Sequence, residues 1–305
     1  MERIYDMIVI GGGPGGYTAA LYAARAGLQV LVLEKLSAGG QMALTSQVDN
    51  YPGFPEGVDG FELAERMQQQ AERFGAVTEL AHVTGLRLEG DIKEVQTSEG
   101  PFYSKTVVIA TGANPRQLGL GGERELVGRG VNYCAACDGM FYRGKTVVVV
   151  GGGNTAAADA LLLSRLAKKV ILVHRRDTLR ATKIYHKPLQ DAENVEFRWN
   201  SAVEALVSGE KLTGVKLRDL ENDQVSLVEA DGLFISIGRK PATELVAGQL
   251  ELDESGYIRA GEDTKTNIPG VFAAGDVRTK AVRQIVTATA DGAAAAFAAE
   301  HFLAD

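Results

Sequence analysis

Near its start the chain carries a short apolar run over 5–10, followed at 11–16 by the glycine-rich stretch GGGPGG. From there to about Ala26, apolar and small residues recur with helical spacing, and a second apolar run covers 29–33. A short apolar run, a tight glycine turn and a longer helical pattern predict a buried strand, a turn and a helix, with the next apolar run as the following strand. The pattern therefore predicts a βαβ unit in this part of the chain.

The same order of apolar and glycine positions returns 140 positions later. An apolar run over 145–150 precedes the stretch GGGNTA at 151–156, a helical pattern continues to about Leu166, and a further apolar run covers 170–173. The repeat predicts an α/β protein with two Rossmann-like dinucleotide-binding units.

The glycines of a G-x-G-x-x-G turn have separate mechanical roles. The first makes the turn, the second lets the backbone approach a pyrophosphate, and the third allows the helix to pack closely on the strand. A single turn of this kind also occurs as a plain connection, but strand, turn, helix and next strand agree here in both units, which favours nucleotide binding. The cofactor residues predicted from the two turns are Gly11, Gly13, Pro14, Gly16, Gly151, Gly153, Asn154 and Thr155.

The residue that ends the second strand of each unit faces the adenosine ribose and selects the nucleotide. Glu34 can accept hydrogen bonds from both ribose hydroxyls, which favours a nucleotide without a 2′-phosphate, FAD or NAD. The equivalent position in the second unit is His174, followed by Arg175, Arg176 and Arg180. These cations suit a 2′-phosphate, since guanidinium groups bind phosphate oxygens in a bidentate manner, and they predict NADPH. The alternative for the three arginines is a solvated charged face.

Composition narrows the class of protein. The 305 residues suffice for about two domains. A formal net charge of −7 disfavours nucleic-acid binding, and the apolar runs are shorter than the roughly 18 residues of a membrane helix. The first residues show no leader-like apolar segment, so we expect no signal peptide and a cytoplasmic location. Glycine, with 36 residues, is clustered, which favours backbone packed against ligands.

The chain has two cysteines, Cys134 and Cys137, which form one C-x-x-C pair. Two cysteines exclude a disulfide scaffold in a chain of this length, and an isolated C-x-x-C in a reducing compartment indicates redox chemistry. A metal site is disfavoured because the four histidines are scattered and there is no second C-x-x-C. FAD beside NADPH is the combination that links hydride transfer to a disulfide, so the pair is predicted to be the redox-active centre.

Taken together, these motifs resemble the low-molecular-weight, bacterial-type thioredoxin reductases. Each motif is common by itself, whereas their order and spacing through almost the whole chain are specific. Reductases of the glutathione and lipoamide type share both nucleotide units but carry a C-x4-C near the first one. The residues of the resemblance are GGGPGG at 11–16, GGQM at 39–42, NYPGF at 50–54, ATG at 110–112, VNYCAACDG at 131–139, GGGNTA at 151–156, HRRD at 174–177, IGRKP at 237–241 and AGDV at 274–277.

The resemblance implies an FAD-binding domain formed by residues 1–115 and 244–305, with an NADPH-binding domain, residues 116–243, inserted between them. The glycine- and proline-containing segments 111–115 and 238–242 suit the two crossings. The resemblance also implies that the inserted domain rotates on these crossings, so that one flavin faces the nicotinamide and the cysteine pair in turn. A homodimer is implied by the family alone.

The resemblance also implies roles for individual residues. Cys137 is the sulfur that faces the flavin and Cys134 attacks the partner disulfide; the sequence alone does not rank them. Asp138 matches the family's acid, which would need burial to raise its pKa; the alternative is a helix N-cap. Asp276 is expected to hydrogen-bond flavin ribityl or phosphate-linked oxygens. The other expected flavin-side residues are Gly40, Gln41, Asn50, Thr111, Gly112, Gly275, Arg283 and Gln284.

The sequence thus predicts an NADPH- and FAD-dependent thioredoxin-disulfide reductase that acts by thiol-disulfide exchange. Nucleic acid and membranes are not expected as partners. One alternative is a reductase of another small dithiol protein, glutaredoxin-like or peroxidase-linked. The other is a redox sensor that holds both nucleotides without turnover.

Overall fold

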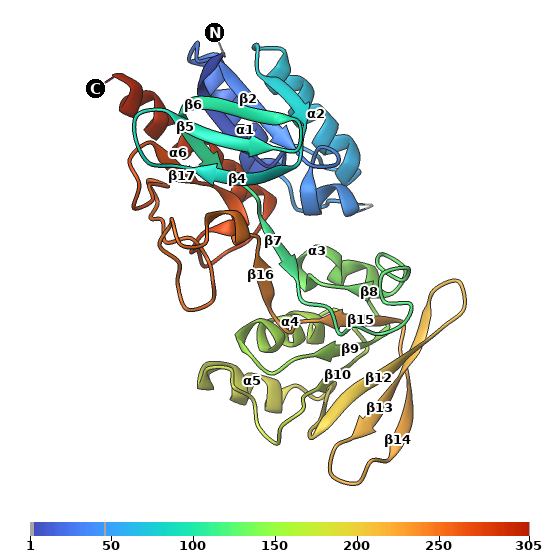
Figure 1. Ribbon diagram of the computed structural model, residues 1–305. Helices are drawn as coiled ribbons and strands as arrows, with labels where there is room; N and C mark the ends of the chain where they lie inside the picture. The colour runs from blue at the N-terminus through green and yellow to red at the C-terminus, as the bar shows by residue number, and fades with distance from the viewer. Residues whose placement is uncertain (1–2, 46, 305) are drawn as a thin grey trace. The chain divides into compact units, whose positions relative to one another are not determined.

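The computed structural model describes residues 3–45 and 47–304 and divides into two compact units (Figure 1). Unit 1 comprises the described residues up to Asn114 and from Lys240 onwards, and unit 2 is Pro115–Arg239. Both combine parallel strands with helices, so the predicted α/β class is confirmed. The ranges 1–115 and 244–305 predicted for the FAD-binding domain include residues 1, 2, 46 and 305, which lie outside the described residues.

Unit 1 is built on a sheet with the strand order β3-β2-β1-β6-β5-β4, in which β17 also pairs with β6. Strands β1, β2, β3, β6 and β17 pair in parallel, whereas β4 and β5 join antiparallel at one side. The carboxyl ends of β1, β2, β6 and β17 therefore meet at one edge. The bounds are β1 Ile4–Ile10, β2 Val30–Glu34, β3 Val77–Leu80, β4 Val83–Arg87, β5 Lys93–Thr97, β6 Gly100–Ile109 and β17 Val271–Ala273.

The helices of unit 1 are α1 (Pro14–Arg25), α2 (Gly60–Glu72) and α6 (Ile285–Ala304), accompanied by the 3-10 turns η1 (Gly40–Leu44), η4 (Glu244–Val246) and η5 (Gly275–Val277). Small residues let α1 and α6 approach closely: a Cβ on Gly292 would lie 2.2 Å from the carbonyl oxygen of Gly15. Alanines of both helices join buried residues of β1 and β2 in one core. The alanine-rich end of the chain is thus packed against the first turns of α1.

Unit 2 contains a parallel sheet with the order β11-β10-β9-β15-β8. Its β9 carries consecutive valines, all buried, as expected for a strand covered on both faces. A second, antiparallel sheet, β12-β13-β14, is formed by residues that lie between β11 and β15 in the sequence. The bounds are β8 Val131–Asn132, β9 Thr146–Val150, β10 Lys169–Val173, β11 Val195–Arg198, β12 Ser201–Ser208, β13 Leu212–Asp219, β14 Val225–Glu229 and β15 Gly232–Ile235. Its helices are α3 Ala135–Asp138, η2 Gly139–Tyr142, α4 Asn154–Ser164, η3 Lys183–Tyr185 and α5 His186–Asp191.

The chain passes between the units through β7 (Ala113–Pro115) and β16 (Arg239–Pro241), which pair with each other. Both strands fall within the segments predicted as crossings. The second boundary comes four residues earlier than the predicted start of the returning segment at 244. The nucleotide that each unit binds, and a rotation on these crossings, stay predictions. Within the described residues, no helix is long and apolar enough to cross a membrane.

Candidate functional site

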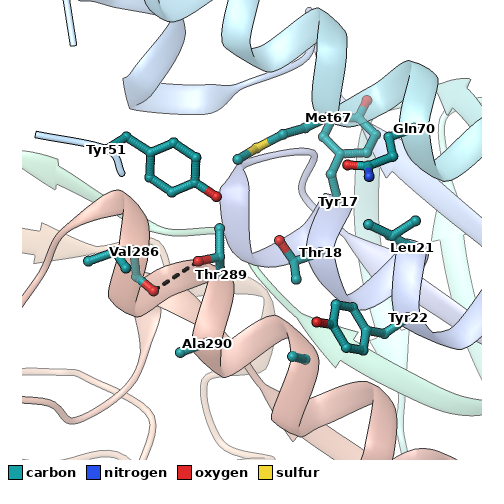
Figure 2. A pocket seen from close by; sticks show the side chains of 11 residues that line it. Tyr17, Thr18, Leu21, Tyr22, Tyr51, Met67, Gln70, Val286, Thr289 and Ala290 are labelled. Carbon is teal, nitrogen blue, oxygen red and sulfur yellow. Dashed lines mark hydrogen bonds between the residues drawn. The ribbon is translucent and has the colours of Figure 1, made fainter. Parts of the chain in front are cut away.

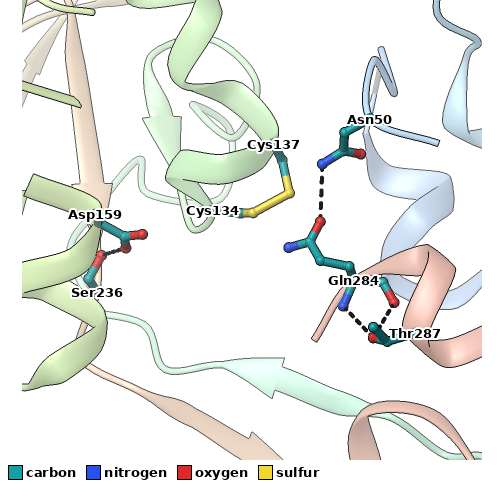
Figure 3. The surroundings of a disulfide bond; sticks show 7 residues. All are labelled: Asn50, Cys134, Cys137, Asp159, Ser236, Gln284 and Thr287. Atoms are coloured by element: carbon teal, nitrogen blue, oxygen red, sulfur yellow. Dashed lines mark hydrogen bonds between the residues drawn. A yellow bond between two sulfur atoms is a disulfide. The ribbon is translucent and has the colours of Figure 1, made fainter. Parts of the chain in front are cut away.

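The two cysteines form a disulfide at the start of a helix in unit 2 (Figure 3). Cys134 is the N-cap residue of α3 and has an extended backbone, and its carbonyl oxygen accepts hydrogen bonds from the amides of Cys137 (3.2 Å) and Asp138 (3.0 Å). A helix start favours a thiolate, because free amides and the helix dipole stabilise negative charge there. Both residues are partly exposed.

Asp138, the last residue of α3, directly follows the redox pair. Burial raises the pKa of its carboxyl to about 6, because the charged form loses hydration. Asp138 also occupies the N-cap position of η2, but its side chain makes no capping hydrogen bond there. A carboxyl group with this pKa can hold a proton near neutral pH, which is the property required of an acid beside a leaving thiolate.

The first glycine turn shows the geometry expected of a pyrophosphate-binding turn. Gly11 has φ +104°, and a Cβ on Gly16 would lie only 1.9 Å from the carbonyl oxygen of Gly11. By contrast, a Cβ on Gly13 would have no neighbour within 4 Å, so this position faces open space. Pro14 begins α1, where its missing amide proton costs no helical hydrogen bond. The first and third glycines therefore serve packing, and the second leaves room for a ligand.

Glu34 ends β2 next to this turn. Its Oε2 accepts a 2.6 Å hydrogen bond from the amide of Gly12, and its Oε1 accepts one of 2.7 Å from the amide of Lys35. Oε1 also accepts the amide of Leu36 at 3.3 Å. These bonds fix the carboxylate at the carboxyl edge of the sheet, and Oε2 keeps a lone pair for a further donor. Its role toward a ribose stays a prediction.

Other predicted flavin-side residues contact distant parts of the chain. Asn50 donates a 3.0 Å hydrogen bond to Gln284 across 234 positions (Figure 3), and the Thr111 hydroxyl donates one of 2.7 Å to Ala242. The Arg283 guanidinium lies 4.0 Å from the centre of the Tyr257 ring. The Gln41 side chain donates a 3.0 Å hydrogen bond to Asn114. The predicted glycines Gly40, Gly112 and Gly275 all have positive φ. Asp276 lies in η5.

In unit 2, His174 is buried, and its role toward a nucleotide stays a prediction. It follows β10 as predicted, but it is only 5% exposed, and its ring fills the space that a Cβ on Gly152 would need. Burial lowers the pKa of His174, and the nearby Arg180, Arg176 and Arg175 lower it further. These effects favour the neutral form of the imidazole, which packs against the turn at Gly152. The cations available to a phosphate are the three arginines, which are exposed.

Sequence reasoning missed a pair of residues at the carboxyl edge of the unit 2 sheet. The Ser236 hydroxyl, directly after β15, donates a 2.5 Å hydrogen bond to Oδ2 of Asp159 on α4 (Figure 3). Burial raises the pKa of Asp159, and the bond from Ser236 offsets part of that effect. The feature of the sequence that could have pointed to this pair is one acidic residue, Asp159, within an otherwise apolar stretch of helix.

A buried ionic cluster beneath the Gly275 turn was also missed. Asp291 on α6 is 7% exposed and accepts hydrogen bonds from Arg278 (2.7 and 3.0 Å), from Lys280 (2.7 Å) and from the amide of Gly275 (2.9 Å). Burial by itself would raise the pKa of Asp291, but the bonds and charges of the two cations lower it. The cluster holds the turn that carries Asp276. The feature of the sequence that could have pointed to this cluster is an aspartate within an alanine-rich helix.

An uncharged pocket of about 370 Å³ opens between α1, α2 and α6 in unit 1 (Figure 2). Tyr17, Tyr22 and Tyr51 line it together with Met67 and Val286. Its lining contains none of the nucleotide-binding residues predicted above. Among the described residues, there is no group of three or more His, Cys, Asp or Glu that could hold a metal ion.

Two nucleotide-type parallel sheets and a redox disulfide define an oxidoreductase that couples a pyridine nucleotide to a dithiol. The chain belongs to the pyridine nucleotide-disulphide oxidoreductase family, whose profile matches residues 5–292. Flavin and nicotinamide cofactors follow from that family. The resemblance stated from the motifs is confirmed.

Individual relatives match over nearly their whole length. The thioredoxin reductase of Streptomyces clavuligerus is 48% identical, covering 100% of this chain and 95% of its own. That of Mycolicibacterium smegmatis is 44% identical, with 100% and 98% covered. The crystal structure of thioredoxin reductase from Streptococcus pyogenes MGAS5005 superposes with a TM-score of 0.93 at 41% identity, covering 100% of this chain and 99% of that one.

Proposed function

We propose that this protein is a thioredoxin reductase that uses NADPH and FAD to reduce the disulfide of a small dithiol protein. The observation that carries the proposal is the Cys134–Cys137 disulfide at a helix start, followed directly by a carboxyl group whose pKa burial raises to about 6. Relatives named thioredoxin reductase at 44–48% identity over the whole chain support the choice of partner.

The residues of each unit fit one nucleotide. In unit 1 the open position at Gly13 admits a pyrophosphate, and the negative carboxylate of Glu34 favours ribose hydroxyls over a 2′-phosphate, which suits FAD. In unit 2 the exposed Arg175, Arg176 and Arg180 suit the 2′-phosphate of NADPH. When bound, these groups supply hydride transfer and deliver an electron pair to the disulfide.

The chain's own residues carry out the exchange. Reduction of the Cys134–Cys137 bond yields two thiols. The Cys134 thiolate attacks one sulfur of the partner disulfide, forming a mixed disulfide and releasing a partner thiolate. Asp138 gives a proton to a leaving thiolate. Cys137 then attacks the sulfur of Cys134, which releases the second partner thiolate and restores the Cys134–Cys137 bond.

The direct test is NADPH-driven reduction of thioredoxin by the purified protein, with flavin absorbance followed at the same time. We expect C134S and C137S each to reduce turnover to background and C137S to trap a mixed disulfide through Cys134. Full turnover by either variant would refute the proposal. If a glutaredoxin-like protein were reduced faster than thioredoxin, that protein would be the partner instead. Reduction of the flavin without electron transfer to any partner would indicate a sensor.

We also propose that the protein is a homodimer acting in the reducing cytoplasm, where a dithiol pair stays functional. The exposed large apolar side chains Tyr22, Val286 and Phe297 lie on α1 and α6. Tyr22 and Val286 line the uncharged pocket of Figure 2, and Phe297 follows further along α6. Val286, Ala290, Ala293 and Phe297 follow helical spacing along α6. An uncharged face of this kind suits a second copy of the chain, because self-association brings identical faces together.

A further inference from the structure

Glu123 is a buried carboxylate in unit 2 with four donors directed at it. Glu123 is only 2% exposed to solvent. It accepts hydrogen bonds from the amides of Leu118 (3.1 Å), Gly119 (2.8 Å) and Leu120 (3.2 Å) and from the Tyr133 hydroxyl (2.6 Å). A carboxylate held in this way is positioned by its neighbours, since leaving any one donor unpaired in the interior costs free energy.

Tyr133 is the residue through which this carboxylate reaches the redox pair. Burial raises the pKa of the Tyr133 phenol, and the hydrogen bond to Glu123 raises it further, so the hydroxyl stays protonated and remains a donor. Tyr133 is joined by one peptide bond to Cys134, whose extended backbone caps α3. The bond to Glu123 therefore restrains the chain immediately before the first sulfur.

The other donors of Glu123 come from the segment 118–120, which follows β7. The carboxylate thus ties the segment that enters unit 2 to the segment that carries Cys134. These two segments share no strand pairing with each other, so Glu123 supplies a connection that the sheet does not.

We propose that Glu123 is a positioning residue for the Cys134–Cys137 pair and acts through Tyr133; the inference rests on the redox role proposed for these cysteines. Closing a disulfide from two thiols depends on how often the two sulfurs meet, which a restrained backbone increases. Loosening the chain before Cys134 lowers that effective concentration. The equilibrium then shifts from disulfide toward dithiol.

The test measures this equilibrium in the purified holoenzyme, without NADPH or thioredoxin. The protein is equilibrated with mixtures of reduced and oxidised dithiothreitol, quenched with acid, and its free thiols are alkylated and counted. We expect Y133F and E123Q each to shift the equilibrium toward dithiol by about fivefold, which corresponds to roughly 20 mV. Y133F removes only one hydroxyl and leaves the three amide bonds of Glu123 in place, so it tests the connection even where E123Q fails to fold.

The matched control is Asp219→Asn. Asp219 also accepts two backbone amides, from Glu221 (2.8 Å) and Asn222 (3.3 Å), but in the turn that follows β13. It should lower stability slightly and leave the dithiol equilibrium unchanged. A shift of less than twofold in Y133F, or an equal shift in D219N, would overturn the positioning role. The proposed function is tested separately, because its failure appears as NADPH-driven turnover that survives C134S.

Discussion

Gly16 approaches Gly11 so closely that a Cβ on Gly16 would lie 1.9 Å from the Gly11 carbonyl oxygen. A contact of this length is with backbone and cannot be relieved by a side-chain rotation. Three positions earlier in the chain, a Cβ on Gly13 would meet nothing within 4 Å. Neighbouring glycines of one turn are therefore required for different reasons.

Replacement of Gly16 by alanine should destabilise the folded protein by about 3 kcal/mol, because the helix must move away from the strand. Gly13→Ala should change the free energy of unfolding of the flavin-free protein by less than about 0.5 kcal/mol, since its φ of −80° suits alanine. It should nevertheless weaken flavin binding at least tenfold, because the methyl group occupies the approach of the pyrophosphate. Thermal unfolding and flavin titration separate the two effects, and equal loss of stability in both variants would contradict this division.

Asp138→Asn should alter the pH dependence of stability. Burial raises the pKa of Asp138 from 3.8 to about 6, so the folded state binds a proton more tightly than the unfolded state. Its stabilising contribution is present below pH 4 and is lost as the pH rises through about 6. Urea unfolding of the oxidised protein should give equal stability for wild type and variant at pH 4, and a variant more stable by up to about 3 kcal/mol at pH 7.

The same substitution should slow disulfide reduction. The wild-type rate should fall as the pH rises through about 6, because the protonated form of Asp138 disappears, whereas D138N should be slower and show no such limb. An unchanged rate and pH profile would remove Asp138 from the mechanism.

Removal of the unit 2 arginines should change the nucleotide preference. Alanine at Arg175, Arg176 and Arg180 should lower kcat/KM for NADPH by at least tenfold, mainly through KM, and leave that for NADH nearly constant, since only NADPH carries the 2′-phosphate. Lys168→Ala, which removes an exposed cation after α4, is the control. If both nucleotides lost activity equally, the arginines would form a general charged surface.

Asp291→Asn should be strongly destabilising, by about 3–5 kcal/mol, because it leaves Arg278 and Lys280 buried without their anion. The carboxylate of Asp291 has a lowered pKa, so its contribution is present above pH 4 and is lost as the pH falls below that value. Denaturant unfolding at pH 7 and pH 3 should show the difference between wild type and variant shrinking at the acidic value. Asp253→Asn, a turn carboxylate that accepts Ser255 and Tyr257 amides, should cost about 1 kcal/mol or less.

Phe297→Glu should convert the proposed dimer to a monomer, since a charge on the apolar face of α6 cannot be solvated when two copies meet. Light scattering after size-exclusion chromatography measures the mass. Leu220→Glu changes an exposed apolar residue of unit 2 and should leave the mass unchanged. A monomeric wild-type protein at micromolar concentration would exclude the dimer.

Local patterns predicted the elements around the site well. The glycine turns, α1 and α4 and the strands on either side of them were all expected from the pattern of apolar and glycine positions, and they agree with the structure within a few residues. These features depend on backbone conformation and on which positions are apolar, and both are written in short stretches of sequence. His174 shows the limit of such local prediction. Its position directly after β10 was predicted correctly, but its burial and its lowered pKa depend on packing against Gly152.

The sequence alone determined two nucleotide-type βαβ units, a redox pair of cysteines and the segments through which the chain crosses between its units. Only the tertiary structure decided which distant groups meet: Asn50 with Gln284, Ser236 with Asp159, Gly275 with Asp291, and Tyr133 with Glu123. The physical reason is that parallel strands gather their carboxyl ends at one edge from separate parts of the chain. Burial at such an edge then sets hydrogen bonds and proton affinities that no local pattern encodes.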